Sequence, residues 1–128
     1  MIQIGRKPRG EGMKEREFQK RIVKLVRDDG GIVFNVHGHG MQAPGWPDLY
    51  IALPASELFD SWQGWVELKV GKNKATPLQE HRITQLQKVG CPACVLRLLR
   101  WPMCQIEMKD SANNYLRLVE VLREVEEI

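Results

Sequence analysis

Residues 65–70 read Trp-Val-Glu-Leu-Lys-Val, and nineteen residues before Glu67 the chain reads Trp46-Pro47-Asp48. The apolar alternation of residues 65–70 predicts a strand, and side chains two apart on a strand share a face. Glu67 and Lys69 are therefore expected to project side by side. Residues 48–53 predict the preceding strand, which begins at Asp48. If the two strands pair, two carboxylates can hold one divalent cation while an ammonium group lies beside it.

Each of these motifs also has an ordinary structural explanation. An aspartate after proline often only starts a strand or caps a turn, and an exposed Glu-x-Lys on a strand is often a solvated pair. Either motif alone is a weak sign of function. Both motifs in this order, on two successive strands, favour a metal-dependent site that cuts phosphodiesters.

Length and composition indicate one globular domain. The chain has 128 residues, of which 43% are hydrophobic and 27% charged, enough for a hydrophobic core without disulfides. No apolar run approaches the roughly 18 residues that span a membrane, so we expect no membrane association. The basic N-terminus is followed by no apolar core, which argues against a secretory signal. The odd number of cysteines, three, favours a reducing cytoplasm, in a bacterial or phage-infected cell.

Charge is distributed in blocks along the chain. Residues 1–30 carry a balance of +4, residues 31–68 of −4, residues 69–100 of +6 and residues 101–128 of −3. Basic segments therefore flank the acidic stretch that holds the two carboxylates. This pattern suits a metal centre inside a rim that attracts phosphate, although a charged helix face is just as often only solvated.

The order of predicted elements is helix, three strands, helix, strand, helix. Thr76-Pro77 begins the second helix, with Thr76 as N-cap and Gln79 as its capping-box partner. We expect a flexible basic arm over residues 1–12 and a single domain over 13–128. The predicted helices are 13–29, 76–89 and 111–127; the predicted strands are 32–37, 48–53, 65–70 and 93–99, with a glycine-rich loop at 38–45 and a basic loop at 71–75.

Cysteine and histidine offer alternative sites. Cys91-Pro92-Ala93-Cys94 suits zinc or redox chemistry, but no fourth zinc ligand beyond Cys104 is evident, so we expect small buried side chains. His37 and His39 lie just before Asp48 without a compact histidine–metal motif. We interpret both as loop residues, with phosphate contact as the alternative.

Three segments together resemble the VRR-NUC family of the PD-(D/E)xK nuclease superfamily. They are Gly45-Trp46-Pro47-Asp48-Leu49, Val66-Glu67-Leu68-Lys69 and Thr76-Pro77-Leu78-Gln79. The resemblance runs from about Met13 to Leu98. It implies a restriction-endonuclease-like core, an α/β fold with a mixed central sheet flanked by helices. It also implies cleavage of DNA that depends on Mg²⁺ or Mn²⁺.

The resemblance also assigns roles to residues. Asp48, Glu67 and Lys69 match the catalytic positions, and Gln79 matches a glutamine at the start of the following helix. The family has an acid in its first helix followed four residues later by glutamine, which fits Glu15 rather than Glu17. Metal ligands are then Asp48, Glu67 and Glu15. Residues expected to contact DNA are Lys72, Lys74, His39 and Arg16.

Small stand-alone members of the family look like homodimers that act on branched DNA such as four-way junctions. We therefore expect a homodimer, formed through Trp62 and Trp65 or through the stripe of Leu118, Leu122 and Val125. Two alternatives stay open. One is a non-catalytic DNA-binding module of the same fold, and the other is a flap, nicking or restriction-type nuclease.

Overall fold

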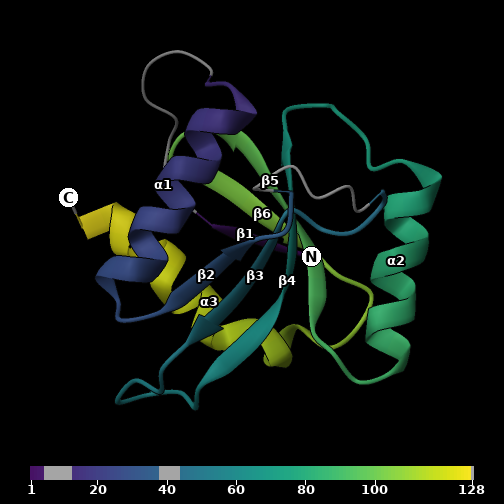
Figure 1. The fold of residues 1–128 in the computed structure, drawn as a ribbon. Coiled ribbons are helices and arrows are strands. Elements are labelled where there is room, and N and C mark those ends of the chain that lie inside the picture. Colours follow the sequence, from purple (N-terminus) through teal and green to yellow (C-terminus); the bar gives the residue numbers. More distant parts are fainter. Residues whose placement is uncertain (5–12, 38–43, 128) are drawn as a thin grey trace.

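A mixed sheet of six strands forms the centre of the molecule. In the computed structural model, which describes residues 1–4, 13–37 and 44–127, the strands are β1 (Ile2–Ile4), β2 (Ile32–Asn35), β3 (Leu49–Leu53), β4 (Trp62–Val70), β5 (Ala93–Arg100) and β6 (Met103–Glu107). Their order across the sheet is β1-β6-β5-β4-β3-β2 (Figure 1). Neighbours are antiparallel except β4 and β5, which run parallel.

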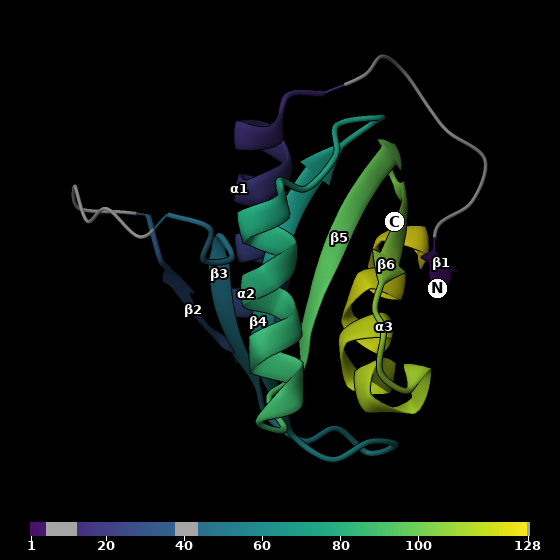
Figure 2. The same ribbon diagram turned by 90° about the vertical axis from the view of Figure 1, so that its right-hand side faces the viewer.

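Helices cover both faces of this sheet. The helices α1 (Glu15–Asp28) and α3 (Leu116–Arg123) lie on one face, and α2 (Pro77–Lys88) lies on the other (Figures 1 and 2). Phe18, Ile22 and Val26 recur every four residues along α1 and are all buried. They pack in one core cluster with the even-numbered residues of β4, such as Leu68.

The connection from β4 through α2 to β5 is a crossover between parallel strands, which requires a helix or a similarly long segment. Thr76 and Gln79 form the predicted capping box at the start of α2. Ile83 of α2 packs in a second cluster with the odd-numbered residues Trp65 of β4 and Val95 of β5. Because side chains alternate along a strand, the odd-numbered residues Glu67 and Lys69 face the α2 side of the sheet.

Two strands were not predicted from the sequence. Residues 2–4 form β1, which pairs with β6 through Ile2↔Ile106 and Ile4↔Cys104, and Ile4 is buried. The expectation of a flexible arm is therefore wrong for residues 2–4, while residues 5–12 lie outside the described part. The order of elements is consequently strand, helix, three strands, helix, two strands, helix. The partner of β1 lies about a hundred residues along the chain, so no local pattern could indicate it.

The predicted last helix is shorter than expected. Its segment forms a 3₁₀ turn at Ala112–Tyr115, then α3, then a second 3₁₀ turn at Glu124–Glu127. Leu118 and Leu122 are buried in the main core, and Trp62 is buried against Tyr115. These three side chains are therefore not available as an exposed dimer surface, which corrects that expectation.

Arg117 joins α3 to the rest of the core. Its side chain, 5% exposed, forms ion pairs with Asp29 and with Glu120 (3.0 Å), and its Nε donates to the carbonyl of Pro54 at 2.7 Å. The ends of α1 and β3 are thereby fixed to α3. Among the described residues, no helix has the length and apolar character needed to cross a membrane.

Candidate active site

Asp48 lies directly before β3 and is held against β4. The register of these antiparallel strands pairs Leu49 with Val66, which places Asp48 opposite Glu67 at the next position. The Asp48 Oδ2 atom accepts a hydrogen bond of 2.9 Å from the backbone N–H of Leu68. Its carboxylate is thus fixed to β4 between Glu67 and Lys69, so the pairing predicted from the sequence is present.

Glu67 is a buried acid beside a second carboxylate. It is 1% exposed, and within the described part of the chain no donor group is hydrogen-bonded to either carboxylate oxygen. Burial, then the charge of the neighbouring Asp48 carboxylate and a hydrogen bond between the two acids, raise the pKa of Glu67 to about 9, while Lys69 acts in the opposite direction. A buried polar group in this condition requires an explanation. A bound cation would supply this explanation, because it would neutralise the charge and would be coordinated by the carboxylate oxygens.

Glu15 belongs to the same electrostatic environment. Partial burial, followed by the charge of Asp48, raises the pKa of Glu15, and Lys69 lowers it. Glu17 instead forms an ion pair of 3.1 Å with Arg21 along the same helix. The structure therefore brings Glu15, and not Glu17, to Asp48 and Lys69.

Lys69 follows Glu67 on the same face of β4. It is half-buried and makes no hydrogen bond or ion pair with any described residue. Its charge nevertheless lowers the pKa of both Glu15 and Glu67. Lys69 is therefore a cation beside the carboxylates whose donors remain available to another group.

The donor set suits a hard cation held by two protein ligands. Among the described residues, no three His, Cys, Asp or Glu side chains are gathered closely enough to hold a metal ion, so Glu15 does not form a three-ligand group with Asp48 and Glu67. Mg²⁺ is commonly bound by one or two carboxylates together with waters and substrate phosphates. The unpartnered oxygens of Glu67, opposite Asp48, fit that mode.

Gln79 has a structural task in this molecule. Its Oε1 accepts from the backbone N–H of Thr76 at 2.9 Å, and its own backbone N–H donates to the Thr76 hydroxyl at 3.2 Å. In the described part of the chain, these cap contacts are its hydrogen bonds, and none joins it to Lys69. The Gln79 side chain is therefore engaged in the cap of α2.

His37 lies next to Asp48. Its Nε2 is 3.0 Å from the carbonyl oxygen of Trp46 and 3.8 Å from Asp48 Oδ1. The backbone explains this, because the N–H of Val36 donates to the carbonyl of Asp48 at 2.9 Å. Sequence reasoning interpreted His37 as a loop residue, although its place at the end of a strand beside the Asp48 strand was an available signal. His39 lies outside the described residues.

The turn before Asp48 rests on α2. Gly45 has φ +77°, and a Cβ atom there would lie 2.3 Å from Leu78 Cγ, so the position requires glycine. Trp46 packs against Trp65 with ring centroids 5.8 Å apart, and the Arg82 guanidinium lies 5.1 Å from the Trp46 ring. Trp46 therefore acts in positioning this turn.

Arg97 is a residue whose role the sequence did not reveal. It lies next to Lys69 in the parallel register and forms an ion pair of 2.7 Å with Glu107 of β6. It also donates to the carbonyls of Gly71, at 2.8 Å, and Asn73. Burial raises the pKa of Glu107, but hydrogen bonds from Arg97 and Gln105 outweigh this and leave it below its ordinary value. Arg97 thus ties the loop that follows Lys69 to the sheet.

The basic side chains expected to contact DNA lie at the surface. Lys72 and Lys74 are exposed on the loop held by Arg97, and Arg16 is exposed in the first turn of α1, beside Glu15. All three therefore belong to elements that also carry or adjoin the carboxylate site. The cysteines lie apart from these groups: Cys94 and Cys104 are buried and Cys91 is half-buried, in agreement with small packed side chains. Burial raises the pKa of the Cys94 thiol.

Comparison with known proteins identifies the fold. No protein-family model matches the chain, and none of the curated proteins matches it. Among solved structures, a VRR_NUC domain protein is 20% identical with a TM-score of 0.50, aligned over 86% of this chain and 88% of that one. The Hjc Holliday junction resolvase of Archaeoglobus fulgidus is 16% identical with a TM-score of 0.51, over 85% of this chain and 98% of that one. This chain therefore has the restriction-endonuclease-like fold that it shares with a VRR_NUC domain protein and with Hjc.

Proposed function

We propose that the protein is a DNA endonuclease that depends on a divalent metal. One observation carries the proposal: Glu67 is buried beside Asp48, and among the described residues no donor group is hydrogen-bonded to its carboxylate oxygens. Two carboxylates with an adjacent free ammonium group suit phosphodiester hydrolysis, in which negative charge develops on the phosphate oxygens.

Each residue has a part in this reaction. Asp48 and Glu67 would hold Mg²⁺ or Mn²⁺, which supplies Lewis-acid polarisation of the phosphate and lowers the pKa of bound water. Lys69 donates hydrogen bonds that orient the attacking water or neutralise charge on a non-bridging oxygen. Glu15 accepts a hydrogen bond from water at the edge of the site. Water adds to phosphorus as the bond to the 3′ oxygen breaks, and that oxygen leaves with a proton.

We further propose that the substrate is branched DNA, such as a four-way junction, and that the protein acts as a homodimer. The shared fold with a Holliday junction resolvase supports this. Two matched cuts on opposing strands of a junction require two sites, which a two-fold dimer provides. The exposed Lys72, Lys74 and Arg16 suit contacts to phosphate; His39 is proposed for the same role from the sequence.

The test is cleavage of linear, flapped, nicked and four-way-junction DNA with Mg²⁺ or Mn²⁺. We expect Asp48→Asn and Glu67→Gln to reduce the rate by at least about 100-fold and to weaken Mn²⁺ binding in calorimetry. Lys69→Ala should bind Mn²⁺ as the wild type does and still lose turnover, because Lys69 is not a ligand. Glu57→Gln, an exposed loop residue, is the control.

Two results would contradict the proposal. The first is cleavage at the wild-type rate by folded Asp48→Asn or Glu67→Gln protein. The second is a wild-type protein that binds DNA and cuts none of the four substrates with either metal. The second result would favour the non-catalytic DNA-binding module.

A further inference from the structure

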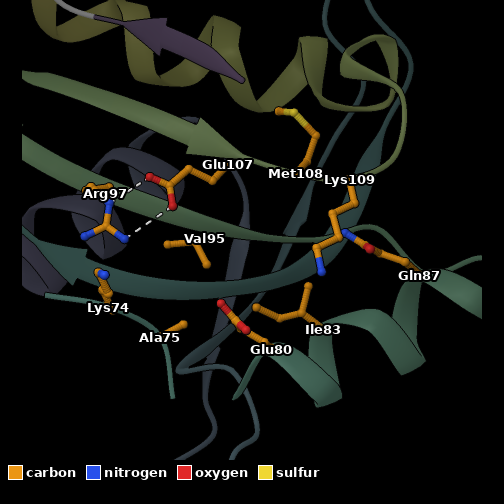
Figure 3. A pocket seen from close by; sticks show the side chains of 10 residues that line it. All are labelled: Lys74, Ala75, Glu80, Ile83, Gln87, Val95, Arg97, Glu107, Met108 and Lys109. Carbon is orange, nitrogen blue, oxygen red and sulfur yellow. Dashed lines mark hydrogen bonds and ion pairs between the residues drawn. The ribbon is translucent and has the colours of Figure 1, made fainter. Parts of the chain in front are cut away.

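A pocket with a volume of about 420 Å³ lies between α2, the strands β5 and β6, and the loop after β4 (Figure 3). This size lies within the range of small-molecule sites. Lys74, Glu80, Ile83, Val95, Arg97 and Lys109 are among the residues that line it. None of the roles assigned above to the carboxylates uses this cavity.

The pocket adjoins the carboxylate site. The parallel register places Val95 beside Glu67 and Arg97 beside Lys69, and these four side chains share the α2 face of the sheet. Neighbouring strands are roughly 4.8 Å apart. A ligand over Val95 and Arg97 would therefore lie one strand away from a phosphate at Glu67 and Lys69. This strand-to-strand distance is close to the distance between the neighbouring groups of one nucleotide.

The lining combines an apolar floor with unpaired charges. Ile83 and Val95 are buried and form the apolar part. Arg97 is already neutralised by Glu107. The Glu80 and Lys109 side chains point into the pocket from α2 and from the segment after β6 (Figure 3), and neither side chain makes a hydrogen bond or ion pair with another described residue. One free acceptor and one free donor thus face each other across an apolar surface.

This chemistry selects among ligands. A phosphate alone would meet the Glu80 carboxylate and an apolar floor, whereas a purely apolar ligand would leave Glu80 and Lys109 unpaired. A nucleobase has apolar faces, which can pack on the apolar floor, and an edge of donors and acceptors, which can pair with Glu80 and Lys109. Lys74 at the rim is then available for the attached phosphate. A base inside a duplex cannot reach such a pocket, because stacking and pairing hold it.

We propose that this pocket receives the base of an unpaired nucleotide adjacent to the phosphate that is cut. The inference rests on the proposed function and deepens it, since it makes branched DNA with an unpaired nucleotide beside the cut the preferred substrate class. Selectivity follows physically: an already unpaired base enters without the few kcal/mol that unstacking a paired base costs.

The first experiment measures binding without metal, in EDTA, to two duplexes that differ by one unpaired nucleotide. We expect the wild type to bind the bulged duplex at least about tenfold more tightly. Glu80→Gln and Lys109→Ala should reduce this preference to less than about twofold; both positions are exposed, so both variants should fold. Lys88→Ala, an exposed lysine of α2 outside the pocket, is the matched control and should keep the full preference.

The second experiment needs neither DNA binding nor cleavage. Methyl NMR of the free protein is titrated with thymidine 5′-monophosphate, and we expect saturable shifts at Ile83, Val95 and Met108 that the double variant Glu80→Gln/Lys109→Ala abolishes. If metal-dependent cleavage is intact, two results would overturn the proposed pocket alone. One is methyl signals that do not shift, and the other is the same preference for the bulged duplex in the wild type and in the pocket variants. Saturable shifts in a protein that cuts no DNA would instead support the pocket and overturn the nuclease.

Discussion

At the scale of single residues, Glu67 shows a conflict between stability and chemistry. A buried carboxylate that lacks a hydrogen-bond partner costs stability, and a buried apolar side chain at this position would not carry that cost. Rules of local packing are broken mainly where function requires it. The side chain that weakens the metal-free protein is therefore the one that we propose as a cation ligand.

A pH dependence follows from Glu67. Its pKa in the folded state is raised above the ordinary 4.5, so the metal-free fold is most stable below that value and loses stability as pH rises towards the folded pKa. We expect urea unfolding in EDTA to show this loss between about pH 5 and pH 8. Glu67→Gln should flatten the slope and be more stable at pH 8 by at least about 1 kcal/mol. The remaining slope belongs to Glu15 and Glu124, whose pKa values are also raised.

Saturating Mn²⁺ should reverse this loss in the wild type, because a ligand that binds only the folded state stabilises it. Glu57→Gln, exposed in a loop, should keep the wild-type slope. An identical slope in Glu67→Gln and wild-type protein would show that Glu67 is not the titrating group.

The sequence predicted part of this site. Strand periodicity and register account for Asp48, Glu67 and Lys69, since spacing along strands is a local property. The choice of Glu15 over Glu17 rests on the family pattern and stays a prediction; in the fold, the charges of Asp48 and Lys69 act on Glu15. The burial of Glu67 was not predictable, because it depends on segments that meet only in the folded chain.

At the scale of elements, the loop after β4 is held by a residue on another strand. Arg97 donates to two carbonyls of this loop and pairs with Glu107, so the loop that carries Lys72 and Lys74 has a fixed position. Fixed lysines lose less conformational entropy when they bind phosphate than mobile ones. The contacts of Arg97 therefore raise the affinity for phosphate, because they order the loop before it binds.

Removal of these contacts should be measurable without DNA. In Arg97→Gln the loop loses the hydrogen bonds that the Arg97 guanidinium donates to two of its carbonyls, and the ion pair with Glu107 is lost as well. We expect trypsin to cut after Lys72 and Lys74 about tenfold faster. Circular dichroism should report an unchanged fold, and Arg123→Gln, exposed on α3, should be cut at the wild-type rate. Equal cutting in Arg97→Gln and wild type would mean that other contacts hold the loop.

The loop lysines should also appear in the salt dependence of DNA binding. Replacing Lys72 and Lys74 with alanine should reduce the slope of log affinity against log salt by about one unit for each lost phosphate contact. Lys88→Ala serves as the control. A slope that does not change would place this loop away from DNA.

Periodicity predicted the first two helices and the strands β2 to β5 well, and it missed β1 and β6. The strands β3, β4 and β5 contain continuous or alternating apolar runs, and each was predicted within three residues of its bounds. The short strand β1 and the half-polar β6 lack such a run, and they are strands because β1 pairs with β6 and β6 pairs with β5. The length of the last helix was overestimated because its apolar spacing continues through the flanking 3₁₀ turns.

At the scale of the whole molecule, one edge of the sheet exposes two large apolar side chains. β2 pairs only with β3, and its Ile32 and Phe34 side chains are 72% and 51% exposed. An edge strand leaves backbone donors and acceptors on its outer side unpaired. A second copy related by a two-fold axis would pair the same edge in antiparallel fashion and cover both side chains.

We therefore expect the homodimer to use β2. Sedimentation at micromolar concentration should give about twice the 14.8 kDa of one chain, and Phe34→Glu should give the monomer. Leu58→Glu, at an exposed apolar position away from β2, should remain a dimer. A wild-type monomer with and without DNA would refute the dimer, and a dimeric Phe34→Glu would refute this edge.

The pairing of β1 with β6 also has a consequence for folding during synthesis. Ile2 is made about a hundred residues before its partner Ile106. The apolar residues of α3 that complete the core are made later still. Domains usually fold during translation once their residues have emerged, but β1 has no partner until β6 has been made. A chain whose synthesis stops before α3 therefore has an incomplete core, and this fold is completed only after α3 has emerged.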